Sequence, residues 1–314
     1  ARAFMSPAPR RLLDGLVERG QLTSEEARLA RRVPVAEDVT VEADSGGHTD
    51  NRPLGALLPV LVRLRDGIVR DHDYPRPLRV GAAGGLGTPA ALAAAFAMGA
   101  DYVLTGSVNQ ASVEAALSRR AKELLLDANL ADVTMAPSPD MFEMGVKVQV
   151  LRRGTLFAQR AQRLYDVYIA HRDLTALPVA VRAEVESILG DPLDVAWART
   201  AAFWRERDPG ELERAERDAR HRMALTFRSY VGLASRWAID GNEARLHDFQ
   251  IWCGPAQGAF NDWVRGTPLE PLEARGVVTI AHHLLEGAAA CTRAAQLRSL
   301  GVAVPASCFT PTPR

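Results

Sequence analysis

The stretch Val39-Thr-Val-Glu-Ala-Asp-Ser-Gly-Gly-His-Thr-Asp50 is the most informative part of the sequence. Its apolar and polar residues alternate up to Ala43, which predicts a short β-strand. The strand runs into a Gly-Gly turn that presents His48 at its carboxyl end. In α/β proteins, ligands and catalytic groups gather at that end of a strand. We therefore expect His48 to lie at a binding site of an α/β protein.

Two further glycine turns follow, after strands that we expect over Leu78–Ala82 and Tyr102–Leu104. The turns are Val80-Gly-Ala-Ala-Gly-Gly-Leu-Gly-Thr-Pro89 and Val103-Leu-Thr-Gly-Ser107. Helical patterns separate and follow the turns, over residues 57–69, 89–98 and 111–128. This rhythm of strand, turn and helix predicts parallel β/α units. Three successive strand ends of this kind predict a cofactor site.

The regions before and after these units have a helical character. Thr23 and Glu26 form a capping-box pattern that opens a short helix ahead of the first strand. Beyond about Arg152 strand signals end, and amphipathic helical patterns take over. A helix rich in Ala and Leu is expected over 269–300, followed by a Pro/Thr-rich tail that we expect to be disordered. We place a domain boundary within 141–153.

Composition excludes several classes of partner. The chain of 314 residues has no net charge, so nothing global points to a nucleic acid or an anionic membrane. No apolar run reaches the roughly 18 residues that span a bilayer, and no signal peptide is recognised. Cys253, Cys291 and Cys308 lie far apart and match no metal-ligand spacing. We expect a reduced, cytoplasmic protein without a metal site.

The second glycine turn fits two kinds of phosphate site. The spacing Gly85-x-Gly87-x-x-Ala90 is compatible with a Rossmann fingerprint, which needs an acidic residue at the end of the next strand. Here Asp101 precedes that strand, which ends in Thr105-Gly-Ser107. This disfavours the Rossmann interpretation. The favoured alternative is a barrel, in which two successive loops hold one phosphate.

The polar residues around the first turn have several possible roles. Glu42 and Asp44 project to one face of the strand, and we expect them to orient the loop or pair with arginine rather than act as catalytic carboxylates. His48 follows the Gly-Gly turn at a suspected phosphate site, which favours a functional role over a structural one. His282 and His283 lie in a helical context without partners at ligand spacing, so we assign them no role.

Several motifs together resemble one known family. They are Glu42–Asn51, Gly81–Pro89, Leu104–Gln110, Met135–Pro137, Asp140–Val150 and Cys253–Asn261. The chain is similar over nearly its whole length to the PfaD family, the trans-acting enoyl reductases of polyketide and polyunsaturated fatty acid synthases. That family is related to nitronate monooxygenases and to FMN-dependent enoyl-ACP reductases. The resemblance implies the C-terminal part of a TIM (β/α)8 barrel over 1–140, a helical region over 141–305 like the malonyltransferase helical insertion, and a tail over 306–314.

The resemblance also implies a flavin site. Gly46 and Gly47 would approach the flavin of FMN, and His48 would lie beside its isoalloxazine ring as the catalytic residue. The FMN phosphate would be held by residues of the other two turns, namely Ala83, Gly84, Gly85, Thr105, Gly106 and Ser107. NADPH would be the reductant, and the substrate would be an enoyl thioester on an acyl carrier protein. His48 would then donate a proton or stabilise the enolate.

Some expectations concern partners and rival functions. Arg152, Arg153, Arg160 and Arg163 are candidates for docking the acidic carrier protein, although a solvated helix face is the more common role of such charges. A nitronate monooxygenase and a non-catalytic synthase scaffold are the alternative functions. Members of the family carry roughly half a barrel ahead of the matching region. We therefore expect this chain on its own to be unstable or poor in flavin.

Overall fold

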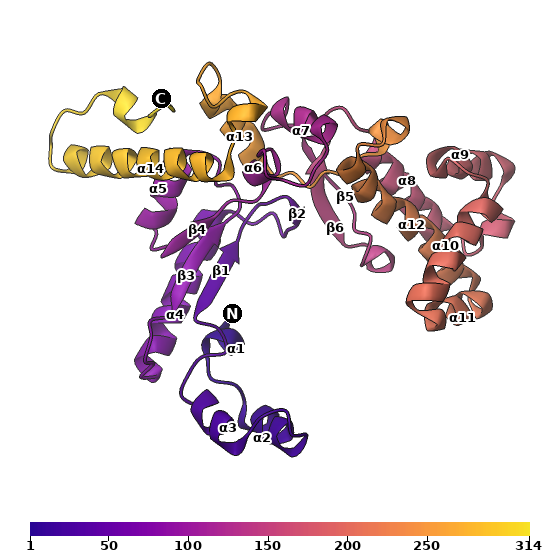
Figure 1. Ribbon diagram of the computed structural model, residues 1–314, viewed down its shortest axis with the longest axis horizontal. Coiled ribbons are helices and arrows are strands. Elements are labelled where there is room, and N and C mark those ends of the chain that lie inside the picture. Colours follow the sequence, from indigo (N-terminus) through magenta and orange to yellow (C-terminus); the bar gives the residue numbers. More distant parts are fainter. The chain divides into compact units, whose positions relative to one another are not determined.

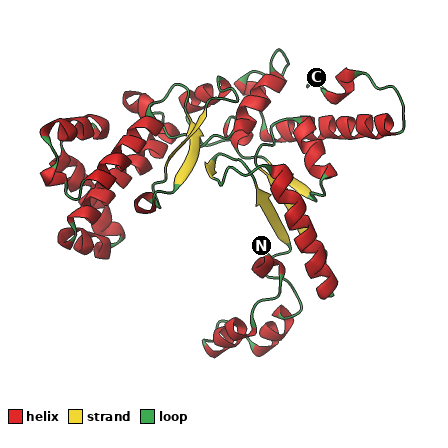
Figure 2. Cartoon of the chain, turned by 180° about the vertical axis from the view of Figure 1, so that it is seen from behind, coloured by secondary structure: helices red, strands yellow, loops and turns green.

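The computed structural model describes residues 1–314, which form two compact units. Unit 1 comprises residues 1–45, 49–109 and 262–314, and unit 2 comprises residues 46–48 and 110–261. Most of unit 2 is the continuous stretch from Gln110 to Asn261, and the domain boundary within 141–153 stays a prediction. Helices predominate over two short sheets, as the red and yellow elements of Figure 2 show.

Unit 1 contains a parallel sheet in the order β1-β3-β4. These strands are β1 (Asp38–Glu42), β3 (Arg79–Ala83) and β4 (Tyr102–Leu104), and α4 (Leu54–Asp71) and α5 (Pro89–Ala97) connect them (Figure 1). Their bounds lie within a few residues of the predicted ones, so the α/β prediction is confirmed for this part. The three strands form an open sheet and no closed barrel is present.

The other elements of unit 1 come from both ends of the chain. The N-terminal helices are α1 (Arg2–Met5), α2 (Arg10–Glu18) and α3 (Ser24–Ala30). The predicted capping box at α3 is present, because Thr23 Oγ1 accepts from the Glu26 N–H and Glu26 accepts from the Thr23 N–H. From the C-terminal end, η4 (Leu272–Ala274) precedes α14 (Val277–Ser299), which packs along α5 (Figure 1).

The C-terminal segment is ordered against α14, contrary to the expected disorder. It forms a short helix, η5 (Ala306–Phe309), and the indole Nε1 of Trp263 donates to the Pro311 carbonyl at 2.7 Å. The Arg298 guanidinium lies over the Phe309 ring, 4.3 Å from its centroid. These side-chain contacts join residues far apart in sequence, so the Pro/Thr-rich composition did not indicate them.

Unit 2 contains a second sheet that the sequence analysis missed. It is antiparallel, in the order β2-β6-β5, with β2 (Gly47–His48), β5 (Val133–Pro137) and β6 (Lys147–Leu151). β6 lies inside the region predicted to be helical throughout. Its residues from Val148 to Leu151 are all buried. Lys147, Val148, Gln149 and Val150 alternate between polar and apolar residues, as in a strand, but the resemblance assigned this stretch to a helical region and no strand was predicted there.

Helices make up the rest of unit 2. They are α7 (Arg119–Leu126), η1 (Phe142–Met144), α8 (Phe157–Ala170), η2 (Leu174–Ala176), α9 (Val179–Leu189), α10 (Leu193–Arg207), α11 (Pro209–Arg217), α12 (Ala219–Asp240) and η3 (Glu243–Asp248). Two more helices, α6 (Ser107–Gln110) and α13 (Pro255–Val264), lie where the chain passes between the units. The helix predicted over 111–128 is shorter than expected, because Ser118 caps α7 by accepting from the Ala121 N–H.

Candidate functional site

The three predicted strand ends of unit 1 meet at one edge of the parallel sheet. Glu42 is in register with Ala83, and Ala83 with Leu104. The loops that follow β1, β3 and β4 therefore start side by side. Two of the predicted cofactor residues are Ala83, which ends β3, and Thr105, which directly follows β4.

Gly84 lets two of these loops approach each other closely. Its φ is +85°, and a Cβ added there would lie 2.7 Å from the carbonyl carbon of Ala43 and 2.8 Å from its oxygen. Only glycine fits such a position, both in conformation and in space. Gly84 is therefore needed to pack the loop after β3 against the end of β1.

Gly85 and Gly106 have open space where other residues would carry a side chain. Gly85 has a φ of +71°, and an added Cβ at either glycine would meet no atom within 4 Å. Both residues are exposed. Just beyond, Thr88 caps α5 by accepting from the Ala91 N–H, and Pro89 occupies its first turn. The loop after β3 thus leads to a helix N-terminus with room beside its backbone, as a phosphate site requires.

The loop after β4 is held by Asn109. The Asn109 amide donates to the Thr105 carbonyl at 2.9 Å and accepts from the Thr105 hydroxyl at 3.1 Å. Ser107 is buried behind this loop, whereas Gly106 is exposed at its tip. Asn109 thus fixes the loop that presents Gly106.

Glu42 and Asp44 orient the first loop, as one of the alternatives predicted. Glu42 accepts from the Ser45 hydroxyl at 2.8 Å. Asp44 accepts from the Asn51 amide at 3.0 Å, and Asn51 itself adopts a left-handed φ of +52°. These contacts give both carboxylates a structural role at the loop.

His48 is part of unit 2, where β2 pairs with β6 and places His48 opposite Val148. Its Nε2 lies 3.1 Å from the Ser138 hydroxyl and 3.3 Å from Asp140 Oδ1. The imidazole also meets the Trp252 ring edge to face, with centroids 5.5 Å apart. The His48 side chain remains 40% exposed, which leaves it accessible to a reactant.

Asp140 is held as a carboxylate. The Ser138 hydroxyl donates to Asp140 Oδ1. This hydrogen bond, and to a lesser extent the contact with His48, lowers the pKa of Asp140 below its ordinary value, although partial burial opposes the shift. Asp140 is therefore ionised at neutral pH and serves as an acceptor for the groups around it.

Gly46 and Gly47 pack closely against the segment from Trp252 to Gly254. A Cβ on Gly46 would lie 2.8 Å from the Cys253 nitrogen. Gly47 has a φ of +82°, and a Cβ there would lie 2.7 Å from Cε3 of Trp252. Contact with this segment is thus a sufficient reason for glycine at both positions, and their approach to a flavin stays a prediction.

Ser138, Asp140 and Trp252 are the site residues that sequence reasoning missed. Ser138 lies 90 residues from His48 along the chain, in a short connection after β5. The motifs Met135–Pro137, Asp140–Val150 and Cys253–Asn261 contain or flank these residues, but no local pattern pairs them with His48. Only the antiparallel sheet brings them together.

Other candidate groups have structural explanations. Cys253 is buried, and burial raises the pKa of its thiol to about 12, so it is no nucleophile at neutral pH. In the same motif, the Asn261 amide donates to the carbonyls of Leu125 and Ala128, both at 2.8 Å, at the end of α7. No group of three or more His, Cys, Asp or Glu side chains is placed to hold a metal ion.

The four arginines proposed for docking are ion-paired within unit 2. Arg160 binds buried Asp248 at 2.6 Å, and Arg163 pairs with Glu184 at 2.7 Å. Arg152 and Arg153 approach Asp132 at 4.0 and 3.4 Å. Arg160 therefore has a clear structural role, and the other three retain at least partly exposed side chains.

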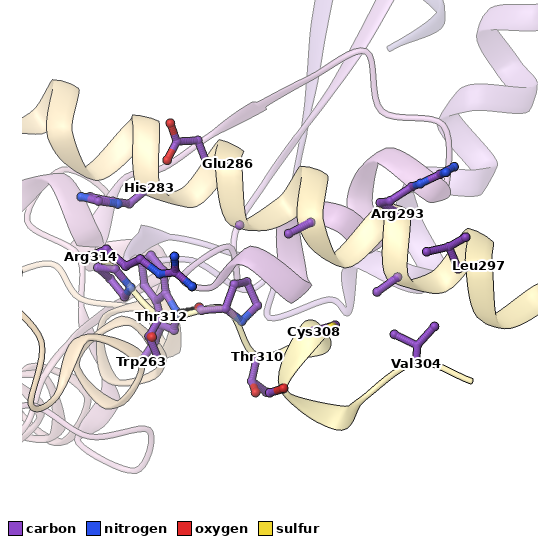
Figure 3. A pocket seen from close by; sticks show the side chains of 16 residues that line it. Trp263, His283, Glu286, Arg293, Leu297, Val304, Cys308, Thr310, Thr312 and Arg314 are labelled. Atoms are coloured by element: carbon purple, nitrogen blue, oxygen red, sulfur yellow. Dashed lines mark hydrogen bonds between the residues drawn. The ribbon is translucent and has the colours of Figure 1, made fainter. Parts of the chain in front are cut away.

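One cavity of unit 1 is lined by none of the predicted site residues. It measures about 890 Å³ and lies in unit 1 between α14 and the C-terminal segment. Figure 3 shows His283, Glu286 and Arg293 along α14, with Cys308 and Thr310 on the segment that lines the opposite side. His283 thus borders a cavity, although the sequence assigned it no role.

Comparisons with known proteins agree on one family. The chain is 38% identical, with a TM-score of 0.88, to the crystal structure of the enoyl reductase domain of MlnA from the macrolactin biosynthesis cluster of Bacillus amyloliquefaciens, covering 95% of this chain and 67% of that one. It is 46% identical over 313 residues to a polyunsaturated fatty acid synthase protein of Thraustochytrium sp., covering 96% of this chain and 15% of that protein. It is 44% identical over 291 residues to polyketide biosynthesis protein PksE of Bacillus subtilis, covering 91% of this chain and 37% of that protein.

Two further findings bear on the helical part and on membranes. A model of the inserted helical domain of [acyl-carrier-protein] S-malonyltransferase matches residues 171–249, within the predicted helical region. None of the helices combines the length and the apolar character needed to cross a bilayer.

Proposed function

This chain belongs to the family of the MlnA enoyl reductase domain, and on that premise we propose that it is the C-terminal part of a TIM-barrel, FMN-dependent, trans-acting enoyl reductase. Its substrate would be an enoyl thioester carried by an acyl carrier protein during polyketide or polyunsaturated fatty acid synthesis. The observation that carries the proposal is the 38% identity and TM-score of 0.88 to that domain over 95% of this chain. The chain spans 15–37% of the length of the curated relatives reported above.

The loops of unit 1 fit the phosphate of FMN. Gly85 and Gly106 are exposed, and a Cβ added at either would meet no atom within 4 Å. The N-terminus of α5 follows the loop that contains Gly85 and would favour an anion there. Gly84 would hold the loop after β3 in position for the phosphate, because it packs against Ala43. Ala83, Thr105 and Ser107 flank these glycines and complete the proposed phosphate site.

The residues of unit 2 supply the proton chemistry in this proposal. Bound FMN, reduced by NADPH, would provide the hydride for the β-carbon of the enoyl thioester. His48 would donate the proton that the α-carbon then requires, or stabilise charge on the thioester oxygen. Gly46 and Gly47 directly precede it and place it on β2 against Trp252.

An acyl carrier protein is the proposed partner, in a cytoplasmic setting. The match of residues 171–249 to the helical domain of an acyl-carrier-protein malonyltransferase supports this choice. The proposed contacts are Arg152 and Arg153, which are exposed, and Arg163, which is half-buried. Turnover of a carrier-bound substrate should then fall with added salt, and charge reversal at these arginines should remove that dependence.

An anaerobic half-reaction experiment tests the function. The full-length polypeptide that contains this chain is purified, and its flavin spectrum is recorded before and after addition of NADPH. We expect NADPH to bleach the flavin and an enoyl carrier protein to restore the oxidised spectrum. A protein without flavin would favour a scaffold role. Reoxidation by a nitroalkane and oxygen, but not by the enoyl thioester, would favour a nitronate monooxygenase.

A further inference from the structure

The hydrogen bonds around His48 determine which ring nitrogen carries a hydrogen. Nε2 faces two oxygens, the Ser138 hydroxyl at 3.1 Å and Asp140 Oδ1 at 3.3 Å. The single hydroxyl hydrogen of Ser138 is donated to Asp140 Oδ1. Ionised Asp140 has no hydrogen to give. Both oxygens can therefore only accept from Nε2.

Neutral His48 is thus held as the tautomer with hydrogen on Nε2. Its Nδ1 then carries the lone pair, and no protein group makes a hydrogen bond to Nδ1. When His48 is protonated, Nδ1–H becomes the available donor, and the carboxylate on the Nε2 side stabilises the positive charge. The arrangement thus fixes Nε2 by hydrogen bonds and leaves Nδ1 available to a substrate.

We propose that Ser138 and Asp140 are positioning residues that hold His48 as the Nε2–H tautomer, so that Nδ1 is the atom that transfers the proton to the substrate. The inference deepens the proposed enoyl reductase function and rests on it. Asp140 is the charged group in contact with the ring. The strand β6 places Val148 opposite His48, and the neighbouring segment contributes the uncharged indole of Trp252.

The proton transfer balances without a further reactant. Addition of hydride to the β-carbon leaves an enolate with an electron pair shared by the α-carbon and the thioester oxygen. The Nδ1–H bond of the imidazolium breaks, its electron pair stays on Nδ1, and the enolate pair forms the new C–H bond at the α-carbon. The 40% exposure of His48 allows solvent to restore the proton to Nδ1.

The tautomer can be observed directly in the full-length protein. Imidazole ¹⁵N spectra of protein labelled at histidine, assigned by comparison with His48→Ala, should show hydrogen on Nε2 of His48. Asp140→Asn introduces an amide that can donate to Nε2, so we expect the spectrum to shift toward the Nδ1–H tautomer. The exposed Asp127, at the end of α7, gives the matched control Asp127→Asn, which should leave the spectrum unchanged.

Kinetics provide the second measurement. Asp140→Asn and Ser138→Ala should each slow enoyl reduction at least about tenfold, less than the 10²–10⁴-fold expected when an acid is removed outright. Reduction of the bound cofactor by NADPH should stay at the wild-type rate in both. Ser138→Thr keeps the hydroxyl and should restore turnover, which a merely structural contribution of the serine would not require.

The outcomes separate this inference from the function on which it rests. If wild-type protein does not reduce an enoyl thioester, the proposed function fails, while the tautomer spectrum still tests the hydrogen-bond assignment. If wild-type protein is active but His48 carries its hydrogen on Nδ1, the inference is overturned. It is equally overturned if folded Ser138→Ala and Asp140→Asn retain full turnover. Should Asp140→Asn fold poorly, the Ser138→Ala and Ser138→Thr pair decides.

Discussion

The two sheets of this protein offer chemistry of different kinds. At the edge of the parallel sheet, the candidate groups are backbone: Gly84, Gly85 and Gly106 shape loops with space beside the main chain. At the antiparallel sheet they are side chains: His48 on β2 is hydrogen-bonded to Ser138 and Asp140, which follow β5. Main-chain loops suit the binding of a phosphate, whereas titratable side chains suit proton transfer.

This contrast predicts that cofactor binding and the rate of reaction depend on different regions of the chain. Changes at the glycine loops should weaken cofactor retention, because they displace the main chain that would contact the phosphate. Changes around His48 should slow the chemistry with the cofactor still bound. Substitutions in the two regions should therefore have effects that can be measured separately.

Removal of His48 should have the largest effect. His48→Ala should lower enoyl reduction by about 10²–10⁴-fold, because the proposed proton donor is removed. The flavin content, measured from the visible spectrum of the full-length protein, should be unchanged. His282→Ala, in an exposed position on α14, is the matched control and should retain activity. Loss of flavin in His48→Ala would contradict the separation of the two regions.

Substitution of Gly84 should have the next largest effect. It should lower stability and cofactor retention rather than the rate of the reaction. Gly84→Ala combines a left-handed φ with a 2.7 Å approach to the Ala43 carbonyl carbon, so we expect a loss of about 2–5 kcal/mol in the free energy of unfolding. Urea denaturation and flavin content measure this loss and its consequence.

Gly85→Ala is the internal comparison for that experiment. It has a similar φ of +71° but open space, so we expect a loss of only about 1–2 kcal/mol. Gly55→Ala, within α4 and also without neighbours, should be neutral or slightly stabilising. Equal losses at Gly84 and Gly85 would show that the contact with Ala43 is unimportant.

Gly47 allows the contact with Trp252 to be tested in isolation. Gly47→Ala should destabilise by about 1–3 kcal/mol, since a Cβ would lie 2.7 Å from the indole and φ is +82°. When Trp252 is also replaced by alanine, Gly47→Ala should lower the free energy of unfolding by only about 1–2 kcal/mol, the cost of the left-handed φ alone. An undiminished cost would mean that Trp252 is not what requires glycine, and would favour the predicted approach of Gly47 to the flavin.

The sequence indicated one of these regions far better than the other. β1, β3 and β4 and their glycine turns were predicted almost to the residue, because each β/α unit is encoded by a local pattern. His48 was singled out for the same reason. Its partners were not, because Ser138 reaches it through the pairing of β2 with β6 and β6 with β5, which depends on contacts distant in sequence. The alternation of polar and apolar residues in β6 was a local signal for a strand, but the resemblance assigned that stretch to a helical region, so the strand was not predicted.

The smallest expected effect is the contribution of ionised Asp140 to the free energy of unfolding, which should be lost in acid. The Ser138 hydrogen bond lowers the pKa of Asp140 in the folded chain below its ordinary 3.8. Ionised Asp140 therefore stabilises the fold at pH values above 3.8, and this contribution is lost as the pH falls through the lower folded-state pKa. Because the Asp140 side chain is 58% exposed, we expect less than about 1 kcal/mol. The difference in unfolding free energy between wild type and Asp140→Asn should be constant near neutrality and should vanish once the pH has fallen below the lowered pKa of Asp140 in the folded chain. A difference that persisted in acid would mean that Asp140 acts through packing, and its carboxylate would then have no special part in orienting His48.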